Sequence, residues 1–411
     1  MDIIINLRKG DNIIMLNQHY IDMCGQKSVI RELFMYGRER ASEIGYENVF
    51  DYSLGNPSVA PPQSFTDQMV RLLKESEPVS LHGYSPTLGI DSVREAVAQS
   101  LNDRFDMHYE KKDIFMVSGA AGAIAHAARA VTVPGDKIIT FAPYFPEYGP
   151  YIEATGAVLK VVPADISSFQ INFDAFLDML DDKVMAVLIN TPNNPSGIVY
   201  STETIDKLAM ILSEKEEEFG HPIYIISDEP YREIVFGGVD APFIASHYNN
   251  TLTCYSFSKS LSLPGERIGY IAVNPASDNP DEFIKAVTFA LRVLGCVNAP
   301  AFFQKVIAKS WDAEVDYSSY KTRRDILMAI LDKCGIDYFR PQGAFYLFCK
   351  VPSKFKGDDS EFTDYLKKYL ILAAPGAGFG GKGYFRLAYC VSEKTIRNSE
   401  KAFMKAMEEL K

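Results

Sequence analysis

The sequence predicts an α/β protein in which a mostly parallel, seven-stranded sheet lies between helices and is accompanied by a smaller α+β domain. Two observations carry this prediction. Short apolar runs rich in β-branched residues follow one another through the middle of the chain, as strands buried on both faces of a parallel sheet do. Stretches of helical character separate several of them, which indicates a layered α/β domain. The seven runs begin at Ile114, Lys137, Ala157, Val184, Ile223, Thr251 and Ile268.

Two of the separating stretches carry helix signals. Residues 120–131 are small and apolar. Residues 201–219 are amphipathic, start at a Ser/Thr cap at Ser201 and end before Gly220, which fits the usual start and stop signals of a helix. We therefore place a large α/β domain at residues 61–296.

The C-terminal third predicts a different architecture. Long helical stretches over residues 298–334 and 360–369 surround short strands such as AFYLFCK and YFRLAYC. Another amphipathic helix is expected in SVIRELFMYGRERASEIG, which begins at Ser28. We therefore expect a small α+β domain assembled from both chain ends, residues 1–60 and 297–411.

Composition narrows the function classes. A chain of 411 residues suits two domains, and its net charge of −11 disfavours nucleic acid or an anionic membrane as a partner. Six scattered cysteines form no CxxC pair, so neither a disulfide framework nor a metal site is expected. The N-terminal MDIIINLRKGDN has too short an apolar stretch for a secretory signal, and no segment reaches transmembrane length. These features predict a cytoplasmic protein.

Polar residues follow several of the predicted strands. The strands stop at SGAAGA, APYF, NTPNNPSG, SDEPY and SFSK. Because ligands bind beyond the carboxyl ends of strands in open parallel sheets, these segments could meet in one crevice. SFSK continues as SLSLPGERIGY, which places Arg267 eight residues after Lys259.

SFSKSLSLPGERIGY resembles the cofactor-lysine signature of class I/II aminotransferases, the fold-type I enzymes that depend on pyridoxal phosphate (PLP). NTPNNPSG, SDEPYRE, HGYSPTLGIDSVREA and YFRLAY occur in the order and approximate spacing of that family. No single one of these motifs is specific for the family, but the five together, in this order, are. The resemblance covers the chain from about Ser28 to its end. The resemblance, closest to aspartate aminotransferase-like members, implies a PLP-dependent transaminase that moves an amino group between an L-amino acid and a 2-oxo acid by ping-pong kinetics.

The resemblance assigns the chemistry to a few residues. Lys259 would hold PLP as a Schiff base, which requires an amine that can be neutral near pH 7. Asp228 would pair with the protonated pyridine nitrogen and keep the ring an electron sink. Tyr231 and Asn194 would hydrogen-bond the phenolic oxygen and lower the imine pKa. The alternatives are a surface lysine, a helix N-cap aspartate, a half-buried tyrosine and a turn-forming asparagine.

The phosphate of PLP needs fixed donors and a positive charge. The glycine-rich turn SGAAGA begins a helix directly after a strand, so its amides and the helix dipole can face an anion, although a tight strand–helix junction would have the same sequence. Two hydroxyls and a bidentate guanidinium would complete the set. The resemblance thus implies a phosphate site of Gly119, Ala120, Ala121, Ser256, Ser258 and Arg267.

Three aromatic residues match further family positions. Phe145 would stack on the pyridine ring, where many relatives carry Trp. Tyr148 stands where some members have a His that supports the aspartate, and its hydroxyl could do the same. Tyr84, in HGYSPTLG, would reach the phosphate of the neighbouring subunit's cofactor. The resemblance therefore implies a homodimer with shared active sites.

The substrate carboxylate would be bound by Arg386 in GYFRLAYC through two parallel hydrogen bonds, together with Gly55 and Asn194. The alternative for this arginine is a snorkelling surface residue. Arg292 lies near the place where aspartate aminotransferases carry a second arginine, but its spacing to Asn298 is about one residue longer and its surroundings are apolar. The alternative is a surface or dimer-contact arginine. Because Arg292 lies near that family position, aspartate is a leading substrate, followed by aromatic and aliphatic amino acids.

Two rival functions share the same motifs. A β-elimination lyase acting on sulfur amino acids would use the same cofactor residues. A non-catalytic ligand sensor fused to a DNA-binding module would need about sixty or more residues before the fold, and the acidic charge disfavours DNA.

Overall fold

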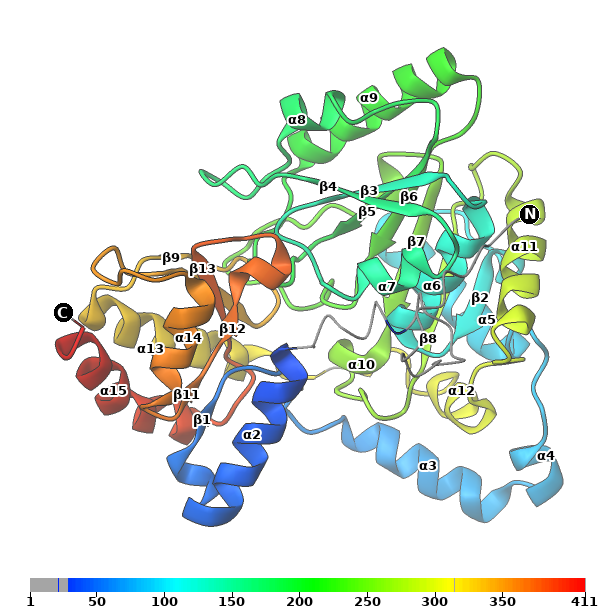
Figure 1. Cartoon of the computed structure of the whole chain (residues 1–411). Helices are drawn as coiled ribbons and strands as arrows, with labels where there is room; N and C mark the ends of the chain where they lie inside the picture. Colours follow the sequence, from blue (N-terminus) through cyan, green and yellow to red (C-terminus); the bar gives the residue numbers. More distant parts are fainter. Residues whose placement is uncertain (1–20, 22–28, 314, 411) are drawn as a thin grey trace, which may run out of the picture.

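The computed structural model of the chain describes residue 21 and residues 29–313 and 315–410. The N-terminal stretch MDIIINLRKGDN, Cys24 and Ser28 lie outside the described residues. The chain forms a larger lobe around a twisted sheet and a smaller lobe that gathers the C-terminal strands and helices together with the first described helix (Figure 1). None of the described helices is long and apolar enough to cross a membrane.

The larger lobe contains the predicted seven-stranded sheet. Its strands are ordered β2-β8-β7-β6-β5-β3-β4, and all neighbours are parallel except that β8 runs antiparallel to both β2 and β7. The mostly parallel sheet is therefore confirmed. The strands are β2 (Ile114–Val117), β3 (Lys137–Phe141), β4 (Val158–Val162), β5 (Val184–Asn190), β6 (Tyr224–Asp228), β7 (Thr251–Ser256) and β8 (Gly269–Val273).

One strand departs from the prediction of burial on both faces. β4 is the last strand of the sheet and pairs with β3 alone. Its side chains alternate between exposed and half-buried from Val158, which is 42% exposed, to Val161, and Val162 at its end is buried. β4 lacks a second neighbouring strand and its outer side chains stay partly open to solvent, whereas the other edge strand, β2, is buried. The prediction of two buried faces is wrong for this strand.

Helices cover both faces of the sheet (Figure 1). They are α3 (Gln63–Glu75), α4 (Pro78–His82), α5 (Asp91–Phe105), α6 (Gly119–Val131), α7 (Tyr148–Glu153), α8 (Phe173–Leu177), α9 (Thr202–Phe219), α10 (Phe257–Ser260), α11 (Pro280–Val293) and α12 (Ala301–Ile307), with 3-10 turns η2 (Lys111–Asp113) and η3 (Ile244–Ser246).

Side chains of β5 show how the sheet is buried. Ala186 and Leu188 pack in one cluster with residues of α6 and α11, whereas Val187 and Ile189 pack in another with residues of α9. The alternation along a strand places successive side chains on opposite faces, so a continuous apolar run is needed where helices cover both. The predicted caps of α9 are also present, since Ser201 Oγ accepts a hydrogen bond from the backbone N–H of Thr204.

The smaller lobe joins both ends of the described chain. A four-stranded antiparallel sheet has the order β12-β13-β10-β9, and the early strand β1 pairs in parallel with β11. Its elements are α2 (Val29–Ile44), η1 (Tyr46–Asn48), β1 (Phe50–Asp51), α13 (Ser318–Cys334), β9 (Tyr338–Phe339), β10 (Tyr346–Lys350), α14 (Asp359–Lys367), β11 (Ile371–Leu372), β12 (Ala374–Pro375), η4 (Gly376–Phe379), β13 (Tyr384–Ala388) and α15 (Glu393–Glu408).

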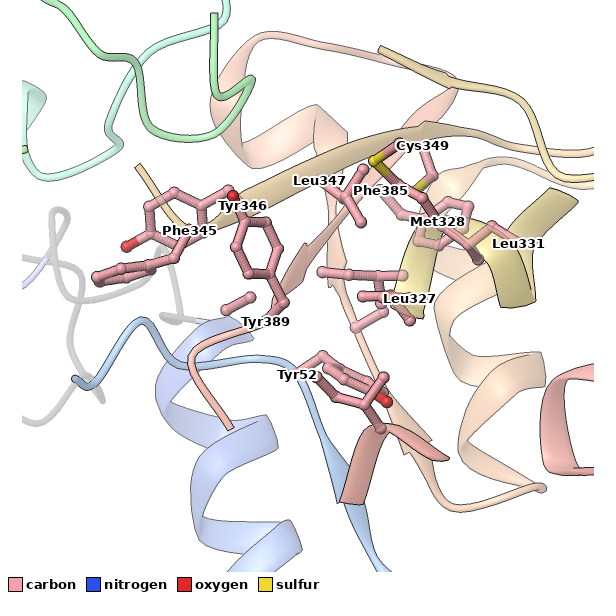
Figure 2. Packing of buried hydrophobic residues seen from close by; sticks show 14 of the residues in the cluster. Tyr52, Leu327, Met328, Leu331, Phe345, Tyr346, Leu347, Cys349, Phe385 and Tyr389 are labelled. Carbon is pink, nitrogen blue, oxygen red and sulfur yellow. The ribbon is translucent and has the colours of Figure 1, made fainter. Parts of the chain in front are cut away.

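The core of the smaller lobe is rich in aromatic residues (Figure 2). Tyr52, which directly follows β1, is fully buried in it beside residues of α13, β10 and β13. Its hydroxyl lies 2.7 Å from Ser399 Oγ of α15. The segment around Tyr52 is therefore part of this core, while the division into domains at residues 61–296 and at 1–60 with 297–411 stays a prediction.

The long helix predicted over residues 298–334 is wrong, because the structure has two helices there. α12 ends at Ile307 and α13 begins at Ser318. Between them, Trp311 and Val315 pack against the cluster that also holds β2 and β8 side chains, and Tyr317 Oη donates to the carbonyl of Ser260 at 2.5 Å. These contacts hold the connection between α12 and α13 against the larger lobe, so one continuous helix does not form there.

Asp359 ties α14 to the glycine-rich loop before β13. Its buried carboxylate accepts hydrogen bonds from the backbone N–H groups of Ala377, at 2.7 Å, and Gly383, at 3.1 Å. The same loop contacts the larger lobe, since the backbone N–H of Tyr144 donates to the carbonyl of Phe379. Asp359 thus fixes the segment that leads into β13.

We expect Asp359→Asn to destabilise the protein by about 1–3 kcal/mol, because a neutral amide can accept only one of the two backbone N–H groups and leaves the other unpaired. The neighbouring Asp358→Asn is a matched control, since Asp358 is an exposed helix cap and asparagine caps equally well. Urea unfolding measured on both variants should separate them. Equal midpoints would show that the buried carboxylate does not hold the loop.

Candidate active site

A cavity of about 260 Å³ lies beyond the carboxyl ends of β5, β6 and β7, where residues of the smaller lobe close it. It brings together most of the residues predicted from the sequence. The predicted residues that line it are Gly55, Ala120, Ala121, Phe145, Asn194, Asp228, Tyr231, Ser256, Ser258, Lys259, Arg267 and Arg386.

Four predicted residues do not line this cavity: Gly119, Tyr148, Tyr84 and Arg292. Gly119 lies against the guanidinium of Arg267, and Tyr148 contacts Asp228. Tyr84 follows α4 and is 92% exposed. Arg292 is exposed near the end of α11, with its guanidinium 5.9 Å from the Phe289 ring. Within its own chain, neither Tyr84 nor Arg292 reaches the cavity.

Lys259 lies on the short helix α10, directly after β7. Ser256 caps this helix by accepting a hydrogen bond from the backbone N–H of Ser258. The half-buried Lys259 Nζ donates to the carbonyl of Gly55 at 2.7 Å. Burial lowers the pKa of Lys259 to about 8, and the nearby charges of two arginines act in the same direction. The amine can therefore lose its proton close to neutral pH and act as a nucleophile.

Asp228 ends β6 with a carboxylate that is 6% exposed. Tyr148 Oη donates to its Oδ2 at 2.6 Å, whereas Oδ1 has no hydrogen-bond partner among the described residues. Burial raises the pKa of Asp228 to about 7. A turn rather than a helix follows it, so the alternative of a helix cap is wrong. The free oxygen is placed to pair with a cationic N–H group.

Asn190 links the ends of two strands to the smaller lobe, and the sequence analysis missed it. Its side chain donates to the carbonyl of Asp228 at 2.8 Å and accepts from the backbone N–H of Asn194 at 2.7 Å. Asn194 Oδ1 in turn accepts from Arg386 Nη1 at 2.9 Å. Asn190 is the last residue of the run VMAVLIN, and its polar side chain at a strand end was a usable signal.

Arg386 is buried in β13, which excludes the alternative of a snorkelling surface arginine. Its guanidinium donates to Asn194 and to the carbonyl of Ser53, while Nε has no partner among the described residues. The rings of Tyr346 and Phe379 lie 4.7 and 4.8 Å from the guanidinium carbon. A buried cation with an unpaired N–H suits a carboxylate ligand.

Arg267 and the first turn of α6 form a part of the cavity that suits an anion. Arg267 donates to the carbonyls of Pro264, at 3.0 Å, and Ser118, at 3.2 Å, which holds the guanidinium over the first turn of α6. A Cβ atom on Gly119, whose φ is +77°, would lie 2.8 Å from Arg267 Nη2. Glycine is therefore required for this approach. Ser256 Oγ lies 2.7 Å from Ser258 Oγ in the same cavity, so hydroxyls, helix amides and a cation face one place.

Pyridoxal phosphate fits this set of residues. The unpaired Asp228 Oδ1 suits the protonated ring nitrogen, Lys259 provides the amine, and the first turn of α6 with Arg267 suits the phosphate. Phe145, whose ring meets that of Tyr148 edge to face, also lines the cavity. These residues therefore offer a partner to the ring nitrogen, to the aldehyde and to the phosphate of the cofactor.

A larger cavity of about 520 Å³ lies elsewhere in the larger lobe, between α5, β7 and the connection from α12 to α13. Arg104, Arg232 and Glu233, which line it, already form ion pairs within the chain. Arg104 binds both oxygens of Glu233, and Arg232 contacts Glu229 and Glu233. Because these charges are satisfied within the chain, the smaller cavity is the candidate active site.

The sequence matches the family described as Aminotransferase class I and II over residues 47–403. It is 29% identical to an aspartate aminotransferase of Thermotoga maritima, over 84% of this chain and 88% of the relative. It is 28% identical to aromatic-amino-acid aminotransferase 2 of Thermococcus litoralis, over 93% and 96%. The crystal structure of an amino transferase from Eubacterium rectale superposes with a TM-score of 0.93 at 43% identity and covers 97% of this chain and 99% of that chain.

Asp228 should make the stability of the cofactor-free protein depend on pH. A carboxyl whose folded pKa lies near 7 and whose unfolded pKa is about 3.9 destabilises the fold increasingly as pH rises through that window. Asp228→Asn, which can keep the Tyr148 contact, should therefore be more stable than the wild type at pH 8, by ~1–4 kcal/mol, and much closer to it at pH 5.

Thermal unfolding of the two cofactor-free proteins at both pH values measures this difference. Asp240→Asn, which removes an exposed carboxylate, gives the baseline. A stability difference that is the same at pH 5 and pH 8 would mean that Asp228 is ionised in the folded protein throughout this range.

Proposed function

We propose, because the chain belongs to the aminotransferase class I and II family, that it transfers an amino group between an L-amino acid and a 2-oxo acid with pyridoxal phosphate as its cofactor. Family membership makes the protein an aminotransferase. The cofactor, the ping-pong order and the residue roles are the proposed part. The observation that carries them is one cavity that holds an amine with a pKa of about 8 and a buried carboxylate with one unpaired oxygen.

The cofactor would be held at its two ends by different parts of the larger lobe. Asp228 would bind the ring nitrogen, Tyr148 would keep that carboxylate oriented, and Arg267 with the first turn of α6 would bind the phosphate. When bound, pyridoxal phosphate supplies the aldehyde that accepts an amino group and a ring that withdraws electrons from the substrate's α-carbon.

Lys259 would have two tasks, to hold the cofactor and to move a proton. Its lowered pKa allows the amine to be neutral when the substrate is bound, so Nζ can take the proton from the substrate's α-carbon. The carbonyl of Gly55 accepts a hydrogen bond from Nζ and so orients it. Tyr231 and Asn194 would donate to the phenolic oxygen of the cofactor.

Arg386 would bind the α-carboxylate of the substrate. Its unpaired Nε and its contact with Asn194 allow two parallel hydrogen bonds to a carboxylate after a small rearrangement. The rings of Tyr346 and Phe379 cover the guanidinium and help to exclude water, which strengthens this interaction.

The donor stays open between two groups of amino acids. Aspartate is the leading candidate, since curated relatives carry that name, but one relative is named for aromatic amino acids. Arg292 does not line the cavity of its own chain, so a role in binding a side-chain carboxylate would require the neighbouring subunit.

We also propose a homodimer in the cytoplasm. Tyr84 is almost fully exposed although the family places the matching tyrosine at a partner's phosphate. Apolar side chains on and after the end of α11 are exposed as well, as expected of a surface covered by a second subunit. These are Phe289, Val293, Leu294 and Val297.

Amino transfer and the role of Lys259 can be tested in one half-reaction. Wild-type protein loaded with pyridoxal phosphate should convert it to pyridoxamine phosphate and release a 2-oxo acid when an amino acid is added. A panel of amino acids, with mass spectrometry of both products, identifies the donor. Lys259→Ala should lower this rate by several orders of magnitude, because the amine that holds the cofactor and moves the proton is lost.

Lys285→Ala, which removes an exposed lysine on α11, should keep the wild-type rate. Borohydride reduction followed by peptide mapping should place the cofactor on Lys259. Attachment to another lysine, or release of ammonia without pyridoxamine phosphate, would reject the assignment or favour a lyase.

Shared active sites can be tested by mixing two inactive variants. Tyr84→Ala and Lys259→Ala should each have little aminotransferase activity as homodimers. In a heterodimer both lesions fall in one site and the other site is wild type. Re-association of equal amounts gives about half heterodimers, so activity should return to about a quarter of the wild-type level. Verified heterodimers without activity would mean that Tyr84 does not serve the neighbouring site.

A further inference from the structure

We propose that Tyr346 is a positioning residue for the cofactor's phenolic oxygen: its hydroxyl donates to Tyr231 and thereby directs the proton of Tyr231 into the cavity. This inference rests on the proposed function, since it assumes that Tyr231 binds that oxygen. No motif in the sequence singles out Tyr346, which lies in the apolar strand AFYLFCK.

The contact joins the two lobes at the active site. Tyr231 lies in the turn after β6 of the larger lobe, and Tyr346 begins β10 of the smaller lobe, beside Phe345 (Figure 2). Their hydroxyl oxygens are 2.8 Å apart, and both residues are buried and line the cavity. The rings meet edge to face at 5.7 Å.

The hydroxyl of Tyr346 lies between Gly55 and Tyr231. A Cβ atom on Gly55 would lie only 2.0 Å from Tyr346 Oη, so the hydroxyl is packed directly against the glycine backbone. Tyr231 is the hydrogen-bond partner that the structure gives this hydroxyl. In the cavity without a ligand either hydroxyl can donate. A hydroxyl has a single proton, so once Tyr231 donates to a cofactor oxygen it can only accept from Tyr346, whose proton then points to Tyr231.

Both hydroxyls keep their protons near neutral pH, since burial raises the pKa of Tyr346 to about 12 and also raises the pKa of Tyr231. Two hydroxyls in series polarise one another, so Tyr231 becomes a stronger donor to a third oxygen. The ionisable groups that influence the pair are Asp228, Arg386, Cys390 and Tyr320.

Tyr346→Phe removes this donor and keeps the ring that covers Arg386. Weaker donation by Tyr231 stabilises the phenolic oxygen less, and the nitrogen joining Lys259 to the cofactor then keeps its proton to higher pH. The pH midpoint of the visible absorbance of the loaded enzyme should therefore rise by about 0.3–1 unit. This spectroscopic midpoint does not depend on turnover.

Tyr52→Phe is the matched control. It also breaks a buried pair of hydroxyls in the same core, since Tyr52 Oη lies 2.7 Å from Ser399 Oγ, but it does not line the cavity. Both variants should lose thermal stability, and only Tyr346→Phe should move the midpoint. A second comparison uses Tyr231→Phe, which should raise the midpoint further and make the addition of Tyr346→Phe silent.

Gly55→Ala perturbs the same contact and retains the hydroxyl, although the Gly55 carbonyl also accepts from Lys259 Nζ. Its Cβ would displace Tyr346 Oη from Tyr231, so the midpoint should shift in the same direction as in Tyr346→Phe. An unchanged midpoint in Tyr346→Phe, or an undiminished effect of Tyr346→Phe in the Tyr231→Phe background, would overturn the inference while leaving amino transfer intact. A wild-type protein that acquires no visible absorbance with pyridoxal phosphate would instead overturn the proposed function, and the inference with it.

Discussion

The buried carboxylate of Asp228, at the end of β6, is the constraint on which the arrangement of the site depends. Burial favours the neutral form of Asp228, and Tyr148 satisfies only one of its two oxygens. Asn190 fixes the backbone of the same residue from the adjacent strand. The carboxylate is thus held in one orientation, and the simplest way to stabilise its charge is a cationic N–H placed in the cavity. A ligand with such a group would remove this cost.

Lys259, in the same cavity, has a pKa that is shifted in the opposite direction. Burial lowers its pKa, as burial raises that of Asp228, so both groups are pushed toward their neutral forms. A ligand that takes the lysine amine into a covalent bond and presents a protonated ring nitrogen to the carboxylate relieves both penalties together. The two shifts, in opposite directions within one cavity, are therefore better explained by a shared ligand than by a structural ion pair.

Most of the fold and much of the site could be predicted because strand ends are marked in the sequence. Apolar β-branched runs stop at polar residues, and parallel strands bring those residues to one edge of the sheet. The exposed edge position of β4 could not be predicted, since strand order depends on contacts between distant segments. The break after α12 could not be predicted either, because Trp311 and Val315 are compatible with a helix until the larger lobe packs against them. Tyr346 was missed for a similar reason: nothing in an apolar strand indicates which hydroxyl will face a cavity.

Two of the contacts that cross between the lobes are also contacts of the proposed chemistry. Arg386 reaches Asn194, Tyr346 reaches Tyr231, and the loop carbonyl of Phe379 accepts from the backbone of Tyr144. A substrate carboxylate that binds Arg386 must alter its contact with Asn194, and any movement of β10 must alter the hydroxyl pair. The position of the smaller lobe and the proton chemistry of the site are therefore coupled by the same few hydrogen bonds. Closure of the lobes would act on the reaction through these bonds as well as by excluding water.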